Sequence, residues 1–103
     1  MIQRYRIIIL PEASAELAEI HSYINQDSAQ NATAVVDAIL NAINSLSAFP
    51  TRFRVYASKK NPEREVRSMV VYPFLVYYQI LEGTQLVVVR NIRHGARRPR
   101  RRF

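Results

Sequence analysis

The sequence contains no cysteine, and this absence excludes a disulfide framework, a thiolate nucleophile and a zinc–thiolate site. Glycine is nearly as scarce, because only two occur in 103 residues, and a Gly-rich phosphate-binding loop needs more. Histidine also occurs only twice, as His21 and His94, which is too few for a histidine-rich metal cluster. We therefore expect a protein that works with no metal ion and no cofactor.

Long hydrophobic runs are missing as well. The N-terminal run IIIL, residues 7–10, is shorter than the core of a signal peptide, and Pro11 and Glu12 follow it at once. No stretch approaches the ~20 apolar residues of a transmembrane helix. These absences predict a soluble, cytoplasmic protein with no membrane partner.

Acidic residues are absent from the last 14 residues, which contain seven arginines. Residues 1–89 hold eight Lys and Arg and eight Asp and Glu, so the whole formal net charge of +7 lies in the final segment. We predict one folded domain over residues 1–95 and an arginine-rich tail over residues 96–103. Such a tail attracts phosphate groups or an acidic protein, unless it is only a solvated end.

Two helices are predicted in the first half of the chain. Residues 4–10, RYRIIIL, are rich in β-branched and aromatic residues and predict a strand before them. From residue 11 to 25 the apolar positions recur at intervals of four, three and four, the stripe of an amphipathic helix. A second stripe begins after Asp27 or Ser28, either of which can cap a helix, and runs to Leu46.

The second half changes to the residue types of strands. Residues 52–56 and 65–81 are dense in Val, Tyr and Phe, and the polar segment between them predicts a loop. The segment EGTQ, residues 82–85, predicts a hairpin turn before a last strand. The predicted fold is α+β, with an N-terminal strand and a two-helix antiparallel hairpin packed on a three- to four-stranded antiparallel sheet.

Two of the predicted strands are apolar on both faces. The segments are FLVYYQIL, residues 74–81, and LVVV, residues 86–89. A strand with one face in water should alternate apolar with polar residues, and the helical hairpin can cover only one face. The pattern has two interpretations, a hydrophobic central strand in a small core or a groove for a binding partner.

The last predicted strand ends at His94, and several arginines lie near this residue in the sequence. His94 is a candidate general acid or base, with Arg67 and Arg97 stabilising charge on a phosphate, as RNA cleavage through the 2′-hydroxyl requires. The alternative is a strand-end histidine that hydrogen-bonds the backbone. Arg67 lies in a predicted strand, from which it can reach Arg90 or His94 on a neighbouring strand. The carboxylates of the first helix are assigned to its solvated face: Glu12, Glu16 and Glu19.

Several segments together resemble a known family. The first helix contains LAEIHSYI (17–24), a later strand contains YPFLVYYQI (72–80), and the last strand closes in VVVRNIRHGAR (87–97). Their order and spacing, with the terminal His-Gly-x-Arg, resemble the ParE branch of the RelE/ParE toxin superfamily of bacterial type II toxin-antitoxin modules. The likeness spans residues 4–98.

The resemblance implies a small toxin of the kind that causes growth arrest and stabilises plasmids. ParE-like toxins typically act on DNA gyrase, whereas RelE-like toxins cut messenger RNA on the ribosome. RelE-like nucleases tend to carry a tyrosine near the C-terminus, and the segment after His94 has only Phe103. This departure favours gyrase inhibition. Two alternatives stay open, a RelE-like ribosome-dependent mRNA endoribonuclease and an inactive relative that only binds.

The resemblance also implies a cognate antitoxin, whose acidic-amphipathic segment lies over the hairpin and sheet in a hetero-oligomer. The residues expected to line that groove are Leu17, Ile20, Tyr77, Tyr78 and Leu81. The residues expected to contact the target or nucleic acid are Arg67, Arg90, Arg93, His94, Arg97 and Arg98. Catalytic roles are assigned only in the endoribonuclease alternative, to Arg67, His94 and Arg97.

Overall fold

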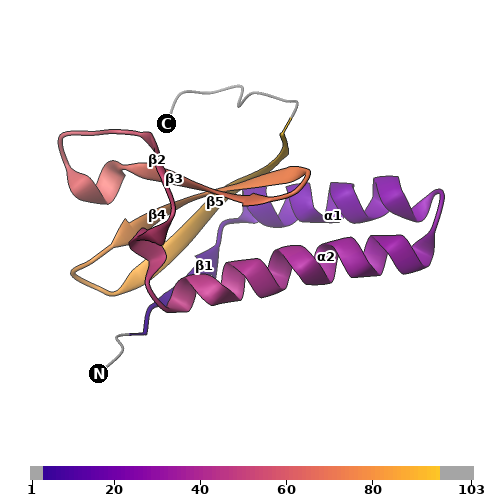
Figure 1. Ribbon diagram of the computed structural model, residues 1–103, viewed down its shortest axis with the longest axis horizontal. Helices are drawn as coiled ribbons and strands as arrows, with labels where there is room; N and C mark the ends of the chain where they lie inside the picture. The colour runs from indigo at the N-terminus through magenta and orange to yellow at the C-terminus, as the bar shows by residue number, and fades with distance from the viewer. Residues whose placement is uncertain (1–3, 96–103) are drawn as a thin grey trace.

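The computed structural model describes residues 4–95 and shows two helices packed against one sheet (Figure 1). The helices are α1 (Pro11–Asn25) and α2 (Ala29–Asn44), and a short loop joins them into an antiparallel hairpin. The strands are β1 (Arg6–Ile9), β2 (Val55–Ala57), β3 (Val66–Val71), β4 (Phe74–Leu81) and β5 (Leu86–His94). Short 3-10 helices are η1 (Ser45–Ser47), η2 (Pro50–Arg52) and η3 (Pro62–Arg64). The α+β class predicted from the sequence is confirmed.

The five strands form one mixed sheet in the order β1-β5-β4-β3-β2. The pairs from β2 to β5 are antiparallel, whereas β1 lies parallel to β5 with Ile9 opposite Val89. The N-terminal strand and the antiparallel strands were predicted, but not that the N-terminal strand joins the same sheet as a fifth strand, parallel to β5. A parallel pair needs a crossover connection, and the chain between β1 and β5 supplies one that contains both helices. The local pattern of residues 4–10 does not say which distant strand will lie beside them.

Both helices begin where local chemistry predicts. Pro11 occupies the first turn of α1, where its fixed φ suits a helix and its missing N–H is not needed. Ser28 caps α2, because its hydroxyl accepts the backbone N–H of Asn31 at 3.1 Å. α2 ends at Asn44, so Leu46, the last predicted helical position, is buried in η1 instead. In the described part of the chain, neither helix is both long and apolar enough to cross a membrane.

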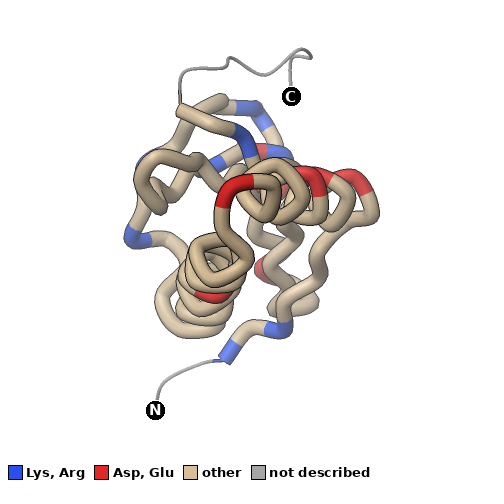
Figure 2. Tube along the Cα trace, turned by 90° about the vertical axis from the view of Figure 1, so that its right-hand side faces the viewer, with Lys and Arg blue, Asp and Glu red and all other residues tan. Residues whose placement is uncertain are grey.

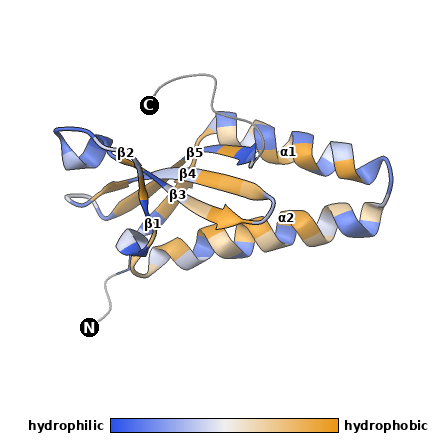
Figure 3. Cartoon of the chain, turned by 45° about the horizontal axis from the view of Figure 1, so that its top comes forward, coloured by the Kyte–Doolittle hydropathy of each residue, from blue (hydrophilic) through white to orange (hydrophobic). Residues whose placement is uncertain are grey.

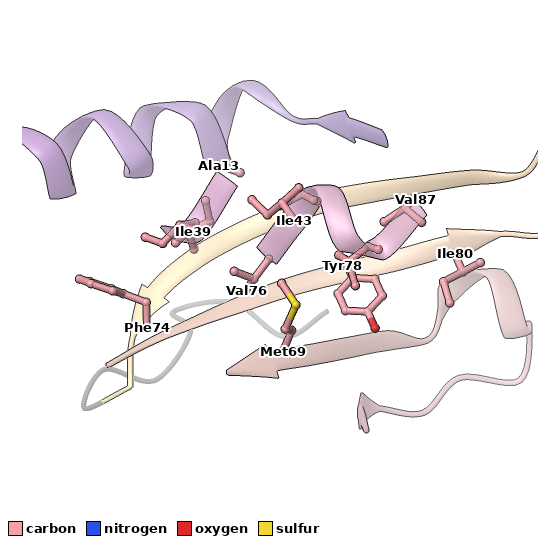
Figure 4. Packing of buried hydrophobic residues seen from close by; sticks show 12 residues of the cluster. Ala13, Ile39, Ile43, Met69, Phe74, Val76, Tyr78, Ile80 and Val87 are labelled. Atoms are coloured by element: carbon pink, nitrogen blue, oxygen red, sulfur yellow. The ribbon is translucent and has the colours of Figure 1, made fainter. Parts of the chain in front are cut away.

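The core lies between the helices and one face of the sheet (Figure 4). Neighbouring residues of a strand point to opposite faces, so alternate side chains of β4 enter this core. From α2 come Ile39 and Ile43, which are almost completely buried. Figure 3 shows apolar residues concentrated on the strands and along the helices. The β4 side chains in the core are Phe74, Val76, Tyr78 and Ile80.

The opposite face of the sheet is partly covered by the chain itself. Tyr77 points away from the helices yet is only 1% exposed. The Tyr56 ring of β2 packs edge-on against it, with centroids 4.9 Å apart, and burial raises the pKa of the Tyr77 hydroxyl. Gln79 Nε2 donates to the Arg64 carbonyl at 3.1 Å, which ties η3 to β4. For the two tyrosines of β4, these contacts favour the first interpretation, a hydrophobic central strand.

Tyr78 makes a buried hydrogen bond that predicts how stability depends on pH. Its hydroxyl donates to the Pro50 carbonyl at 2.6 Å. Burial raises its pKa to about 12, although the charges of Arg67 and Arg52 act in the opposite direction. An unfolded tyrosine has a pKa of ~10, so the folded chain holds this proton more tightly. The stabilisation is complete below about pH 10 and is lost as the pH rises to about 12.

Urea unfolding between about pH 8 and about pH 12 should show this decline. The variant Tyr78→Phe has no hydroxyl to titrate, so its free energy of unfolding should fall less steeply over the same range. Tyr72→Phe is the matched control, because Tyr72 is 92% exposed and its removal should leave the alkaline decline unchanged. An equally steep decline in Tyr78→Phe would contradict the assignment.

Candidate functional site

β5 ends at His94, where its last residues pair with the start of β4. The His94 ring lies opposite Phe74 and meets it edge-on, with ring centroids 5.6 Å apart. The Gly95 N–H donates to the Pro73 carbonyl at 2.7 Å. A Cβ on residue 95 would lie only 3.1 Å from that oxygen, which explains the glycine here. Tertiary contacts therefore hold an exposed histidine at the end of β5.

A β-bulge brings two arginines to the same stretch of β5. The β4–β5 register shifts between Tyr77 and Tyr78, which makes Arg90 the extra residue. Arg90 Nη1 donates to Gln79 Oε1 at 3.2 Å. Arg93 follows in the same strand, and both arginines are half-buried. We call this group the basic end of β5, made of Arg90, Arg93 and His94.

Glu16 of α1 lies against the basic end of β5. Its Oε2 is 2.9 Å from Arg93 Nε, while its Oε1 accepts the Ile92 N–H at 2.9 Å and the Asn91 Nδ2 at 3.2 Å. Its side chain is only 12% exposed. The assignment of Glu16 to the solvated face of the helix is therefore wrong. No local signal could have found this contact, because its hydrogen-bond partners lie 75 and 76 positions away in the chain.

Arg67 lies apart from the basic end of β5. It is on β3, and β4 separates that strand from β5. Its Nη1 donates to the carbonyls of Thr51 at 3.1 Å and Phe53 at 2.7 Å, so it holds the backbone around η2. The expectation that Arg67 reaches Arg90 or His94 is wrong for this reason. Arg97 and Arg98, with the whole tail 96–103, lie outside the described residues.

The residues predicted to line an antitoxin groove do not form one open apolar surface. Tyr77 and Tyr78 are buried on opposite faces of β4. Leu17 and Ile20 pack half-buried against the core, and Leu81 is half-buried at the end of β4. Their contact with an antitoxin stays a prediction. The most exposed large apolar side chains lie elsewhere and were not predicted: Tyr72 (92%), Tyr23 (75%), Val70 (65%) and Phe49 (61%).

The near-neutral body of the protein has an acidic half and a basic half. Residues 11–44, the helical hairpin, contain five Asp and Glu and no Lys or Arg. Residues 45–95 contain eight Lys and Arg and three Asp and Glu. Figure 2 shows this division, with acidic positions along the helices and most basic positions elsewhere. The resulting field favours an anionic partner at the sheet over one at the helices.

The acidic residues of the hairpin do not gather into a metal site. Among residues 4–95, no group of three or more His, Cys, Asp or Glu is placed to hold a metal ion. The arrangement offers two half-buried arginines, of which Arg93 is paired with the Glu16 carboxylate, and one exposed imidazole on the opposite face of the sheet from Arg93.

Comparison with known proteins gives one family match. The family model described as "ParE toxin of type II toxin-antitoxin system, parDE" matches residues 7–99. No curated protein matches the chain.

Solved structures share the fold at low sequence identity. The chromosomal ParDE TA system from P. aeruginosa matches with a TM-score of 0.68 at 16% identity, covering 89% of this chain and 97% of that one. The archaeal RelE-RelB complex from Pyrococcus horikoshii OT3 gives 0.67 at 13%, covering 92% and 99%. The toxin-antitoxin complex RelBE2 from Mycobacterium tuberculosis gives 0.65 at 16%, covering 88% and 98%. At these identities the likeness shows the fold alone.

Proposed function

Since the chain belongs to the ParE toxin family of type II toxin-antitoxin systems, within the RelE/ParE superfamily, we propose that it inhibits DNA gyrase and is neutralised by a cognate antitoxin. The fold is shared by toxins of both branches, so the choice of target rests on the site.

The observation that carries the proposal is the separation of Arg67 from the basic end of β5. RNA cleavage needs a general acid and a general base placed about a scissile phosphate, with cations to stabilise its charge. Arg67, one of the two cations expected to assist His94, instead donates to the backbone around η2. Arg90 and Arg93 remain as cationic donors of β5, but Arg93 and His94 are consecutive in the strand and point to opposite faces of the sheet. This arrangement supports inhibition by binding an anionic surface, such as a gyrase–DNA complex, over cleavage of RNA.

The sheet also offers a surface that suits an acidic, amphipathic antitoxin segment. Val70 pairs with Leu75, and Leu75 pairs with Arg93, so the three residues form one row across β3, β4 and β5. Paired residues share a face of the sheet, and this row joins apolar side chains to a cation. An antitoxin segment on this face would cover Val70 and Tyr72 with apolar residues and pair its acids with the basic end of β5. Leu17 and Ile20 would extend the contact to the helical hairpin.

Purified protein added to supercoiling and DNA-cleavage assays should inhibit gyrase and increase the amount of cleaved DNA. Arg93→Gln should weaken inhibition, because the variant loses a cation at the basic end of β5. Arg64→Gln is the matched control, since Arg64 is exposed in η3 and outside that group. Addition of the antitoxin should restore supercoiling. Normal supercoiling in the presence of excess toxin would contradict the proposal.

His94→Ala separates the proposed function from its alternatives. A gyrase inhibitor should keep part of its activity in this variant, since His94 supplies only one of the contacts of the basic end of β5. In-frame cuts in translated messages that disappear in His94→Ala would instead establish a ribosome-dependent endoribonuclease. Harmless expression of the wild-type chain without antitoxin would support an inactive relative.

A further inference from the structure

β5 extends beyond the strand that pairs with its outer edge. The β1–β5 ladder ends with the Leu10 N–H donating to the Val89 carbonyl at 3.0 Å. The chain then turns into α1 at Pro11, while β5 continues to His94. Past Val89, the edge of β5 therefore has no residue of β1 beside it. Backbone N–H groups at such an edge need another acceptor, because a buried donor without one costs free energy.

The Glu16 carboxylate takes the place of the missing strand. One oxygen accepts the backbone N–H of Ile92 and the side-chain amide of Asn91, and the other contacts the Arg93 guanidinium. Ile92 and Asn91 are nearly buried, and Arg93 is 23% exposed. A single carboxylate thus joins the backbone of β5, an amide and a cation in successive residues of that strand.

The geometry of α1 explains why this residue, and not its neighbours, makes the contact. Ala13 and Leu17 lie four residues apart on the helix and pack into the core. Glu16 precedes Leu17 and projects beside that apolar stripe, toward the edge of β5. Glu12 and Glu19 are exposed on the same helix, which agrees with the solvated-face assignment for both.

The contacts of Glu16 do more than satisfy a charged side chain. Hydrogen bonds to an ionised carboxylate are shorter and stronger than neutral ones, and low exposure limits competition from water. One contact holds the β5 backbone at Ile92, a second holds the Asn91 amide, and the third is an ion pair with Arg93 Nε that lies outside hydrogen-bond geometry. Loss of the carboxylate would free the end of β5 and would leave the half-buried Arg93 cation without its counter-charge.

We propose that Glu16 is a positioning residue, which holds Asn91, Ile92 and Arg93 in place so that the basic end of β5 is preformed for the target of the toxin. The inference rests on the proposed function in one respect, because it takes the basic end of β5 to be the part that contacts the target. Preformed cationic donors do not have to be ordered at the moment of binding, so less of the interaction energy is lost.

The test compares Glu16→Ala and Glu16→Gln with Glu19→Gln, an exposed carboxylate one turn further along α1. Glutamine keeps an acceptor for the Ile92 N–H but has no charge for Arg93. Amide exchange at Ile92 should be at least tenfold faster in Glu16→Ala and within about threefold of wild type in Glu16→Gln. The Arg93 Nε–H NMR signal should shift or exchange faster in both Glu16 variants. Glu19→Gln should match wild type in every measurement.

Activity then decides whether the positioning matters. Glu16→Gln, which should fold even if Glu16→Ala does not, is expected to lose at least tenfold in growth arrest per amount of folded protein. A folded Glu16→Gln with wild-type potency, or an unchanged Arg93 signal, would overturn the inference. Wild-type growth arrest without gyrase inhibition would remove only the gyrase proposal, because the Glu16 comparison uses growth arrest. A wild-type chain that arrests no growth would contradict both the proposed function and the inference about Glu16.

Discussion

A chain that ends at Gly95 is expected to keep its fold and to lose most of its affinity for an anionic partner at low salt. The deleted segment, ARRPRRRF, lies outside the described residues and contains five arginines. Each arginine that contacts a nucleic-acid phosphate contributes up to ~0.9 to the slope of log affinity against log salt concentration. With five such contacts, affinity should fall by roughly 100-fold or more near 50 mM salt and converge with that of the intact chain at high salt.

Binding to the gyrase–DNA complex and to the antitoxin, measured at several salt concentrations, checks this expectation. A full-length variant with glutamine in place of the tail arginines separates charge from chain length. It should behave like the truncated chain. Thermal unfolding should be the same for all three proteins, because the segment offers almost no apolar surface to bury. Unchanged affinity, salt slope and growth arrest would make the tail a solvated end and leave function to the folded sheet.

Replacement of Ile43 by alanine is expected to lower the free energy of unfolding by about 2–5 kcal/mol. Ile43 is 1% exposed and lies on α2 in the core between the helical hairpin and the sheet (Figure 4). The smaller side chain loses transfer free energy and leaves a cavity that the packed core fills only in part. Since whole domains are stable by only ~5–15 kcal/mol, this single change should unfold a large fraction of the chain in mild denaturant.

Urea unfolding with a matched variant provides the measurement. Ile8→Ala removes the same atoms from β1, where the side chain is 43% exposed, and should cost clearly less. A loss below about 1 kcal/mol in Ile43→Ala, or equal losses in both variants, would contradict the assignment of the core to the α2–sheet interface.

Glu16 and Arg67 show why the site was harder to predict than the elements that carry it. The sequence placed Arg67 in a strand and Glu16 on a helix, and both placements are confirmed. Their partners are set by strand order, since Arg67 contacts the η2 backbone and Glu16 contacts the end of β5. Residue type and period carry no information on that order.

The sequence by itself determined the features that depend on near neighbours in the chain. Pro11 and Ser28 start the helices, the apolar stripes place the helical hairpin over a core, and the turn before β5 makes a β-hairpin. Each follows from a local cap, a period of three to four residues or a short loop. The arginine count of the final segment is likewise a property of the sequence alone.

Tertiary structure alone decided the parallel pairing of β1 with β5, the bulge at Arg90 and the contact of Glu16 with the end of β5. It also decided that Tyr77 is covered by the chain's own Tyr56. These features join segments far apart in the sequence. They form because the complete sheet buries its apolar faces and also satisfies the hydrogen bonds at its edges. Both conditions are met only once all the strands are in place.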